Sequence, residues 1–227
     1  MPTLAQLQTR VRDWLSVSST AALPDSYITD SLNLAVRELV SSYDLLIAEQ
    51  TKNISGVAGT QAYNLPQLAT GGTFARFIVI YAVSPDDATQ ISVMNQLPYD
   101  EFVEKYGLAA SIDAGDPIEF TLLGTQILFG PTPSRSITIT CKFYEYPADL
   151  SAGGDTNAFT ADGNPGYPAP WQVILYRAAA LCSKFLLDED RAGVYTEEYQ
   201  FWLNKYTQDN SRRRYTARQF PQMQEPH

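Results

Sequence analysis

The stretch 171-WQVILYRAAALCSKFLL-187 carries the widest apolar face in the chain. Its apolar residues recur at spacings of three, four and seven, the period of an α-helix that turns one face toward a core. The members of this face are Trp171, Ile174, Leu175, Ala178, Leu181, Cys182, Phe185 and Leu186. Burying such a face is strongly favourable, so the sequence predicts that other helices pack against this one.

Three further helices are predicted near the two ends of the sequence. After a break at 188-DED-190, aromatic residues fall on one side of a helix at Tyr195, Tyr199, Trp202 and Tyr206. In the first part, Thr3 and Gln6 have the spacing of a capping box, and Leu4, Leu7, Val11, Trp14 and Leu15 follow at helical spacing. A second helix is predicted from 24-PD-25 to about Leu46, with a stripe made of Ile28, Leu32, Ala35, Leu39 and Tyr43.

Residues 48–150 change to the pattern of β-structure. Runs of β-branched and aromatic residues, bounded by Gly, Pro and Asp, are typical of short strands. These runs are 61-QAYNLP, 74-FARFIVIYAV, 117-PIEFTLLG, 125-TQILFG and 136-SITITCKFYEY. The pair Gly124-Thr125 suits a hairpin turn, and one short helix is expected within 98-PYDEFVEKYG-107, with Gly107 as its stop.

This order predicts an α+β fold in which a β-rich section is inserted into a discontinuous α-helical bundle, because each helix pair needs a partner. The expected parts are 1–47 as the first half of the bundle, 48–150 as an antiparallel β-sandwich or barrel-like section, 151–206 as loop and second half, and 207–227 as a flexible basic tail. Within the bundle, we expect Trp171, Leu175, Cys182 and Phe185 to be buried against Leu7, Val11, Leu32 and Leu39.

Charge is spread unevenly over the 227 residues, which carry a net −9. Residues 205–227 hold five cations and two anions, a net +3 that leaves −12 for the rest. A body so acidic should repel DNA rather than bind it. No apolar run is long enough to cross a bilayer, and the opening MPTLAQLQTR lacks the order of a signal peptide. We therefore expect a cytosolic protein whose two cysteines, Cys141 and Cys182, stay reduced and buried.

The residue types of most catalytic sites are missing from the sequence. The only histidine is His227, and no phosphate-binding glycine motif occurs. Acidic groups at 86–87, 100–101 and 188–190 could serve acid–base chemistry on a glycan, but acidic residues are also common in turns and at the starts of helices. We predict no enzyme, no metal and no cofactor.

The basic cluster 212-RRRY-215, with Arg218, has three interpretations: a solvated tail, contact with an acidic or aromatic surface of a partner protein, or contact with nucleic acid. The acidic body argues against nucleic acid, because like charge repels the phosphates. Arginine forms strong paired hydrogen bonds with carboxylates, which favours a protein partner.

The order of these pieces resembles the head–tail adaptor (connector) proteins of podovirus-like and related tailed bacteriophages. The similarity covers the chain to about Tyr206. It is carried by the opening Leu7-Gln8-Thr9-Arg10-Val11, the helix 25-DSYITDSLNLAVRELVSSYD-44, the hairpin 115-GDPIEFTLLGTQILFGPTPS-134, the strand end 144-YEYPADLS-151, and the segments 167-YPAPW-171 and 185-FLLDEDRAGVYTEEYQFWLNKY-206. Each motif alone is a turn or an amphipathic pattern, and the specificity lies in their joint order.

The resemblance implies a structural protein of the virion neck, assembled in the host cytoplasm as a homo-oligomeric ring of about twelve copies. Its expected partners are the portal protein and a tail tube or nozzle protein, with DNA passing through the channel without sequence-specific binding. A segment that docks on the portal is then expected in the basic tail, with the residues Arg212, Arg213, Arg214, Tyr215, Arg218 and Phe220. The alternatives are a β-rich glycan-binding or baseplate module of a phage tail and a carboxylate hydrolase.

Overall fold

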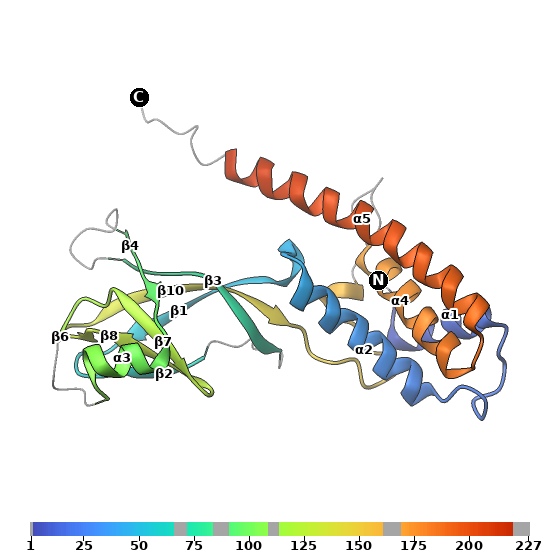
Figure 1. Cartoon of the computed structure of the whole chain (residues 1–227), viewed down its shortest axis with the longest axis horizontal. Coiled ribbons are helices and arrows are strands. Elements are labelled where there is room, and N and C mark those ends of the chain that lie inside the picture. The colour runs from blue at the N-terminus through green and yellow to red at the C-terminus, as the bar shows by residue number, and fades with distance from the viewer. Residues whose placement is uncertain (1, 66–71, 84–90, 109–113, 161–168, 220–227) are drawn as a thin grey trace. The chain divides into compact units, whose positions relative to one another are not determined.

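The computed structural model describes residues 2–65, 72–83, 91–108, 114–160 and 169–219, with the backbone alone after residue 213. The chain divides into two compact units, one made of Met1–Ala48 with Tyr146–His227 and the other of Glu49–Glu145. Helices from both parts of the sequence, blue and orange to red in Figure 1, belong to the first unit. The predicted α+β class, with helices at both ends, is confirmed.

The helical unit contains α1 (Leu4–Leu15), α2 (Asp25–Ser42), α4 (Pro170–Phe185) and α5 (Glu189–Gln219). Helix α4 is central, since it contacts α1, α2 and α5. The predicted core residues Leu7, Val11, Leu32, Leu39, Leu175 and Cys182 are completely buried. The first and last parts of the sequence therefore share one hydrophobic core, which is the packing that the apolar stripes predicted.

Two residues expected in this core lie elsewhere. Phe185 is 45% exposed and packs on Tyr27, with ring centroids 4.2 Å apart. The reason is its place at the end of α4, beside the first turn of α2, where little helix remains to cover it. Trp171, at the other end of α4, is half-buried, and the guanidinium of Arg10 lies 4.4 Å from its ring centre.

The start of α1 ties the two parts of the helical unit together through backbone hydrogen bonds. The predicted capping box is present, with Thr3 and Gln6 exchanging side-chain bonds. The next two free amides, of Leu4 and Ala5, donate to the carbonyls of Asp155 (3.0 Å) and Gly153 (2.9 Å). The loop after the β unit therefore satisfies amides that a helix start leaves without partners. Residues 161–168, within the segment 151–206 expected to begin as loop, lie outside the described residues.

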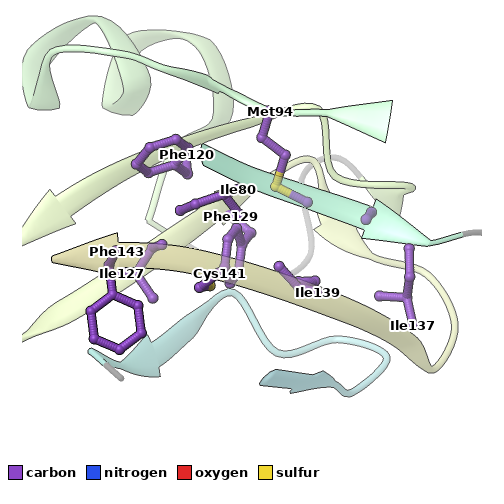
Figure 2. Packing of buried hydrophobic residues seen from close by; sticks show 10 residues of the cluster. Ile80, Met94, Phe120, Ile127, Phe129, Ile137, Ile139, Cys141 and Phe143 are labelled. Carbon is purple, nitrogen blue, oxygen red and sulfur yellow. The ribbon is translucent and has the colours of Figure 1, made fainter. Parts of the chain in front are cut away.

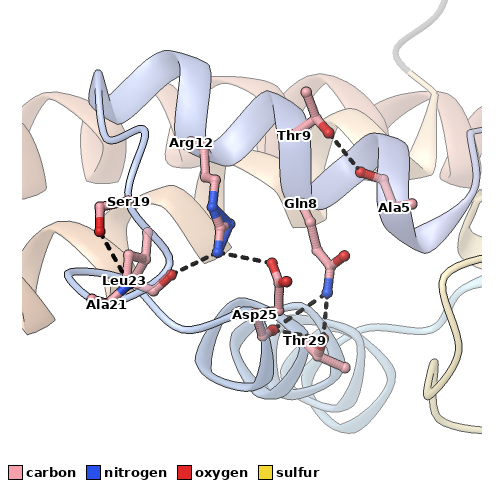
Figure 3. A network of polar contacts seen from close by, with 9 residues as sticks. All are labelled: Ala5, Gln8, Thr9, Arg12, Ser19, Ala21, Leu23, Asp25 and Thr29. Carbon is pink, nitrogen blue, oxygen red and sulfur yellow. Dashed lines mark hydrogen bonds and ion pairs between the residues drawn. The ribbon is translucent and has the colours of Figure 1, made fainter.

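A polar network fixes α1 against α2 (Figure 3). The guanidinium of Arg12 donates to the Leu23 carbonyl (2.7 Å) and pairs with Asp25 (2.8 Å), while its side chain is only 13% exposed. One turn earlier, the Gln8 amide donates to the Thr29 hydroxyl (3.0 Å). Because Arg12 reaches both the end of the connecting turn and the first residue of α2, it sets where the second helix starts.

The described residues of the β unit form two four-stranded sheets and a small two-stranded one. The first sheet has the order β1 (Glu49–Gly56), β10 (Ile137–Tyr146), β3 (Thr73–Val83), β4 (Ile91–Val93), and the second has β2 (Ala62–Asn64), β8 (Gln126–Gly130), β7 (Glu119–Leu123), β5 (Asn95–Gln96). Strands β6 (Ala114–Gly115) and β9 (Thr132–Pro133) form the third. Pairing is mainly antiparallel, but β5 with β7 and β6 with β9 are parallel.

Both large sheets contribute to one core (Figure 2). The first sheet supplies Ile80 and Ala82 of β3 with the inward row of β10, and the second supplies Phe120, Ile127 and Phe129. The apolar row of β10, Ile137, Ile139 and Cys141, is buried, and Phe143 continues it. The predicted hairpin forms at Gly124, whose φ of 60° suits glycine, and α3 (Tyr99–Tyr106) ends at Gly107 with φ 66°.

A candidate interaction surface on the last helix

The first turns of α5 lie against the end of α1, and polar contacts hold them there. Asp188 accepts a hydrogen bond from the amide of Arg191 (3.0 Å), as a residue before a helix start should. The Arg191 guanidinium donates to the Leu15 carbonyl, and the Tyr195 hydroxyl donates to the Trp14 carbonyl (2.8 Å). The first half of α5 is thus fixed at the point where α1 ends.

Aromatic rings continue this contact along the body of the helical unit. Trp14 stacks on Tyr195 at 5.9 Å and contacts Tyr176 of α4 at 4.7 Å, and Tyr176 stacks on Trp202 at 6.3 Å. The predicted aromatic side of the helix therefore faces α1 and α4. Tyr199, on the same side, is buried, and this burial raises the pKa of its phenol to about 12.

Near its end α5 buries three side chains, Tyr206 and the residues three and four positions later. Tyr206, Asp209 and Asn210 are buried, with 8%, 5% and 8% of their surface exposed. Asp209 pairs with Arg213 at 2.8 Å. The Asn210 amide donates to the Asp44 carbonyl (2.5 Å), and its oxygen accepts from the Leu46 amide (2.8 Å). These bonds cross more than 160 residues of sequence.

The prediction of a flexible tail from residue 207 is wrong as far as residue 219, because α5 continues without a break to Gln219. In the sequence, 209-DN-210 has the composition of a solvated segment. In the structure both side chains are buried and bonded, so the helix is held for a full turn beyond Tyr206. The Thr207 hydroxyl also bonds within the helix, to the Leu203 carbonyl at 3.0 Å.

The predicted docking residues follow these buried side chains in the sequence. Arg212 is exposed, while Arg213, with a side chain 46% exposed, is the partner of Asp209. Arg214, Tyr215 and Arg218 belong to the backbone-only part of α5, and Phe220 lies outside the described residues. The structure therefore gives Arg213 a structural contact and places five of the six predicted residues on one continuous helix.

Charge is separated along α5. Its beginning carries Asp188, Glu189, Asp190, Glu197 and Glu198 against the single cation Arg191, whereas its last part carries Lys205 and four arginines against Asp209. Acidic residues at the start and basic residues at the end of a helix both match its dipole. The composition of this helix therefore changes from acidic to basic along its length.

The acidic clusters and the two cysteines lie at positions where such residues serve the fold. Asp100 and Glu101 lie in the first turn of α3, Asp188 precedes α5, and residues 86–87 lie outside the described residues. Both cysteines are buried, which raises the pKa of Cys141 to about 12 and that of Cys182 to about 11.

In the described part of the chain, no cluster of three or more His, Cys, Asp or Glu side chains could hold a metal. Among the same residues, no helix combines the length and apolarity needed to span a bilayer.

Comparison with known proteins gives one strong result. The family model described as SU10 adaptor protein matches residues 2–222 of the chain, which includes both structural units and the whole of α5. No curated protein matches the chain. The family match points to assembly with other proteins.

Proposed function

The chain belongs to the SU10 adaptor protein family, a family of phage head–tail adaptors, and from this premise we propose that it forms a ring between portal and tail. Membership makes the chain a structural protein of a bacteriophage virion that interacts with other head and tail components. Adaptors of this kind are generally not enzymes. The proposal adds the portal above, a tail tube or nozzle protein below, and a DNA channel through the ring.

The observation that carries the proposal is the positive end of α5 on an otherwise acidic chain. The segment 205–227 has a net +3 and the remainder −12. Arginines at the end of a helix can pair with carboxylates or carbonyl groups in a groove of the portal. The proposed docking residues are Arg212, Arg213, Arg214, Tyr215, Arg218 and Phe220.

Several such pairs are needed to produce a stable contact. An exposed ion pair contributes only about 0–1 kcal/mol, so a single arginine would have little effect. Repetition around a ring multiplies the contact, because each bound copy raises the effective concentration of the next. The acidic remainder of the chain supports the proposed channel, since a negative lining repels DNA and lets it slide.

Removing the positive end tests the proposal directly. A truncation after Ser211 keeps the contacts of Tyr206 and Asn210 but removes Arg213, so Asp209→Asn is added to avoid a buried carboxylate that has lost its ion pair. We expect a folded protein that no longer co-purifies with portal-containing heads. The complex of the intact protein should weaken as salt is raised, because screening reduces contacts between exposed charges.

A charge-matched pair of variants separates position from net charge. Changing Arg212, Arg214 and Arg218 to Gln should abolish docking, whereas changing Arg10, Arg37 and Arg135 to Gln alters the net charge equally and should leave docking intact. Normal docking by the truncated protein would overturn the proposed role of this helix end.

A further inference from the structure

The turn between α4 and α5 gathers exposed apolar side chains. Phe185, Leu187 and Val194 are 45%, 86% and 59% exposed, and all three fall in the ten residues from 185 to 194. Leu187 has the largest exposed fraction among the large apolar side chains that the structure describes. Single exposed apolar residues are common on proteins, but a group of them is typical of a contact surface.

Leu187 also has a backbone conformation that disfavours leucine. Its φ is 59°, in the left-handed region where the Cβ atom crowds the following carbonyl. The amides of Leu187 and Asp188 donate to the carbonyls of Lys184 (3.1 Å) and Ser183 (3.0 Å), which is the type of helix end where glycine is the usual residue. The stability of the free chain therefore does not explain a leucine here, because its side chain is neither buried nor favourable for the backbone.

Gly193, in the second turn of α5, is the converse case. Glycine is less favourable than alanine inside a helix, and a Cβ atom added here would meet nothing within 4 Å. Gly193 shares one exposed face of α5 with Asp190, Val194 and Glu197, at spacings of three and four. A glycine on such a face lets the surface of another molecule approach the helix backbone closely.

The charges around these residues define the chemistry of a partner. Residues 184–198 hold five carboxylates and two cations, a net −3. One of the cations, Arg191, pairs with Asp188 at 3.2 Å, whereas Glu189 and Asp190 are exposed. An apolar contact bordered by carboxylates fits an apolar pocket bordered by Lys or Arg. A second copy of this acidic chain would instead bring like charges together.

We propose that the turn between α4 and α5 docks into an apolar pocket with a basic rim on the tail-side protein. The inference rests on the proposed function and deepens it, because it assigns a surface to the tail tube or nozzle protein. Helix α5 is 31 residues long, so its ends lie about 45 Å apart, and the turn is at the end away from Gln219 (Figure 1). The portal takes the other end in the proposed function, so the turn meets a different protein. The docking surface consists of Phe185, Leu187, Glu189, Asp190, Gly193 and Val194.

Two substitutions should stabilise the free protein and weaken tail joining at the same time. Leu187→Gly relieves the left-handed backbone and Gly193→Ala favours the helix, so each should raise the melting temperature by about 2–4 °C. The joining assay mixes purified heads that carry each variant with an extract of cells infected by an adaptor-deficient phage. Tailed particles are then counted by electron microscopy. The rate of joining should fall at least about tenfold for both variants, as for the loss of a central interface contact.

Two substitutions in α1 are matched controls. Ser16 ends α1 with a φ of 55°, so Ser16→Gly gives the same backbone relief without removing an apolar side chain. Thr9→Ala favours the helix at another exposed position. Both should raise the melting temperature and leave tail joining unchanged. Changing Glu189 and Asp190 to Lys should slow joining, and the difference from wild type should shrink as salt is raised.

A photo-crosslinking variant identifies the partner directly. In assembled particles, Leu187→p-benzoylphenylalanine should crosslink to a peptide of the tail-side protein that carries Lys or Arg beside apolar residues. A crosslink to a second copy of this chain would overturn the inference.

Other results overturn the inference separately from the proposed function. Tail joining at the wild-type rate by Leu187→Gly and Gly193→Ala would show that the turn has no part in it. A lower melting temperature of Leu187→Gly would assign the leucine to the fold, and loss of portal co-purification in this variant would place the turn at the portal. Normal portal docking of the protein truncated after Ser211 would instead overturn the proposed function itself.

Discussion

Individual polar residues, together with the shared apolar core, join the distant parts of the helical unit. Arg12 spans the turn between α1 and α2, Asn210 joins α5 to the segment after α2, and Asn33 exchanges two bonds of 3.0 Å with the backbone of Leu150. Each contact satisfies backbone groups outside regular structure, and an unsatisfied group of this kind costs about 1–3 kcal/mol when buried. These residues set where elements begin and end, while the apolar core sets which elements meet.

Asp155 makes a contribution to stability that depends on pH. One carboxylate oxygen accepts from the amides of Ala152 (2.6 Å) and Ser151 (2.7 Å) and from the Ser151 hydroxyl (3.0 Å). These bonds, the Ala152 amide first, lower the pKa of Asp155 below the usual 3.8. The unfolded chain therefore binds a proton more readily, so the contribution is complete above about pH 4 and is lost as pH falls through the lowered pKa.

Asp155→Asn should therefore melt at a lower temperature than wild type at pH 7, and the difference should shrink below pH 4. Thermal unfolding followed by circular dichroism across this pH range measures it. Asp13→Asn, which removes an exposed carboxylate of α1, should show no such convergence. A gap between wild type and Asp155→Asn that stays constant with pH would contradict the role of these bonds.

At the scale of elements, the strongly periodic segments were predictable and the polar ones were not. The capping box of α1, the apolar faces of α2 and α4, and the hairpin at Gly124 all follow from local sequence. Strand β1 was missed because Glu49–Gly56 is polar, with only Gly56 buried, and it pairs along one edge of its sheet. Its order comes from pairing with β10, which no local pattern reveals.

The candidate site was predictable in composition but not in structure. The cluster of arginines was visible in the sequence, whereas the continuation of α5 depends on partners that lie more than 160 residues away. Local reasoning assigns 209-DN-210 to a solvated tail, since both residue types are poor helix formers. The one available signal is the spacing of Tyr206, Asp209, Asn210 and Arg213, which places them along one face of a helix.

The contrast between Leu175 and Phe185 tests the packing of α4. Leu175 is fully buried, so Leu175→Ala should cost about 2–5 kcal/mol of unfolding free energy. Phe185 is 45% exposed and packs on the Tyr27 ring, so Phe185→Ala should cost less, below about 1.5 kcal/mol. Urea unfolding of the two variants measures both values. Equal losses would show that Phe185 is part of the core after all.

At the scale of the whole molecule, the prediction concerns the order of assembly. We expect the free protein to be a monomer, or at most weakly associated, and to form its ring on the portal. A ring that formed early would compete with ordered assembly. Lateral contacts that are weak between free copies become strong once the portal holds many copies side by side, because their effective concentration rises.

Sedimentation velocity of the purified protein, alone and with portal rings, measures this order of events. The free protein should sediment close to its 25.2 kDa monomer, and the mixture should show a complex with a ring of copies bound. The truncation after Ser211 should stay monomeric even with portal present, because it lacks the end that the template holds. A stable ring in the absence of portal would contradict templated assembly while leaving docking through α5 open to its own test.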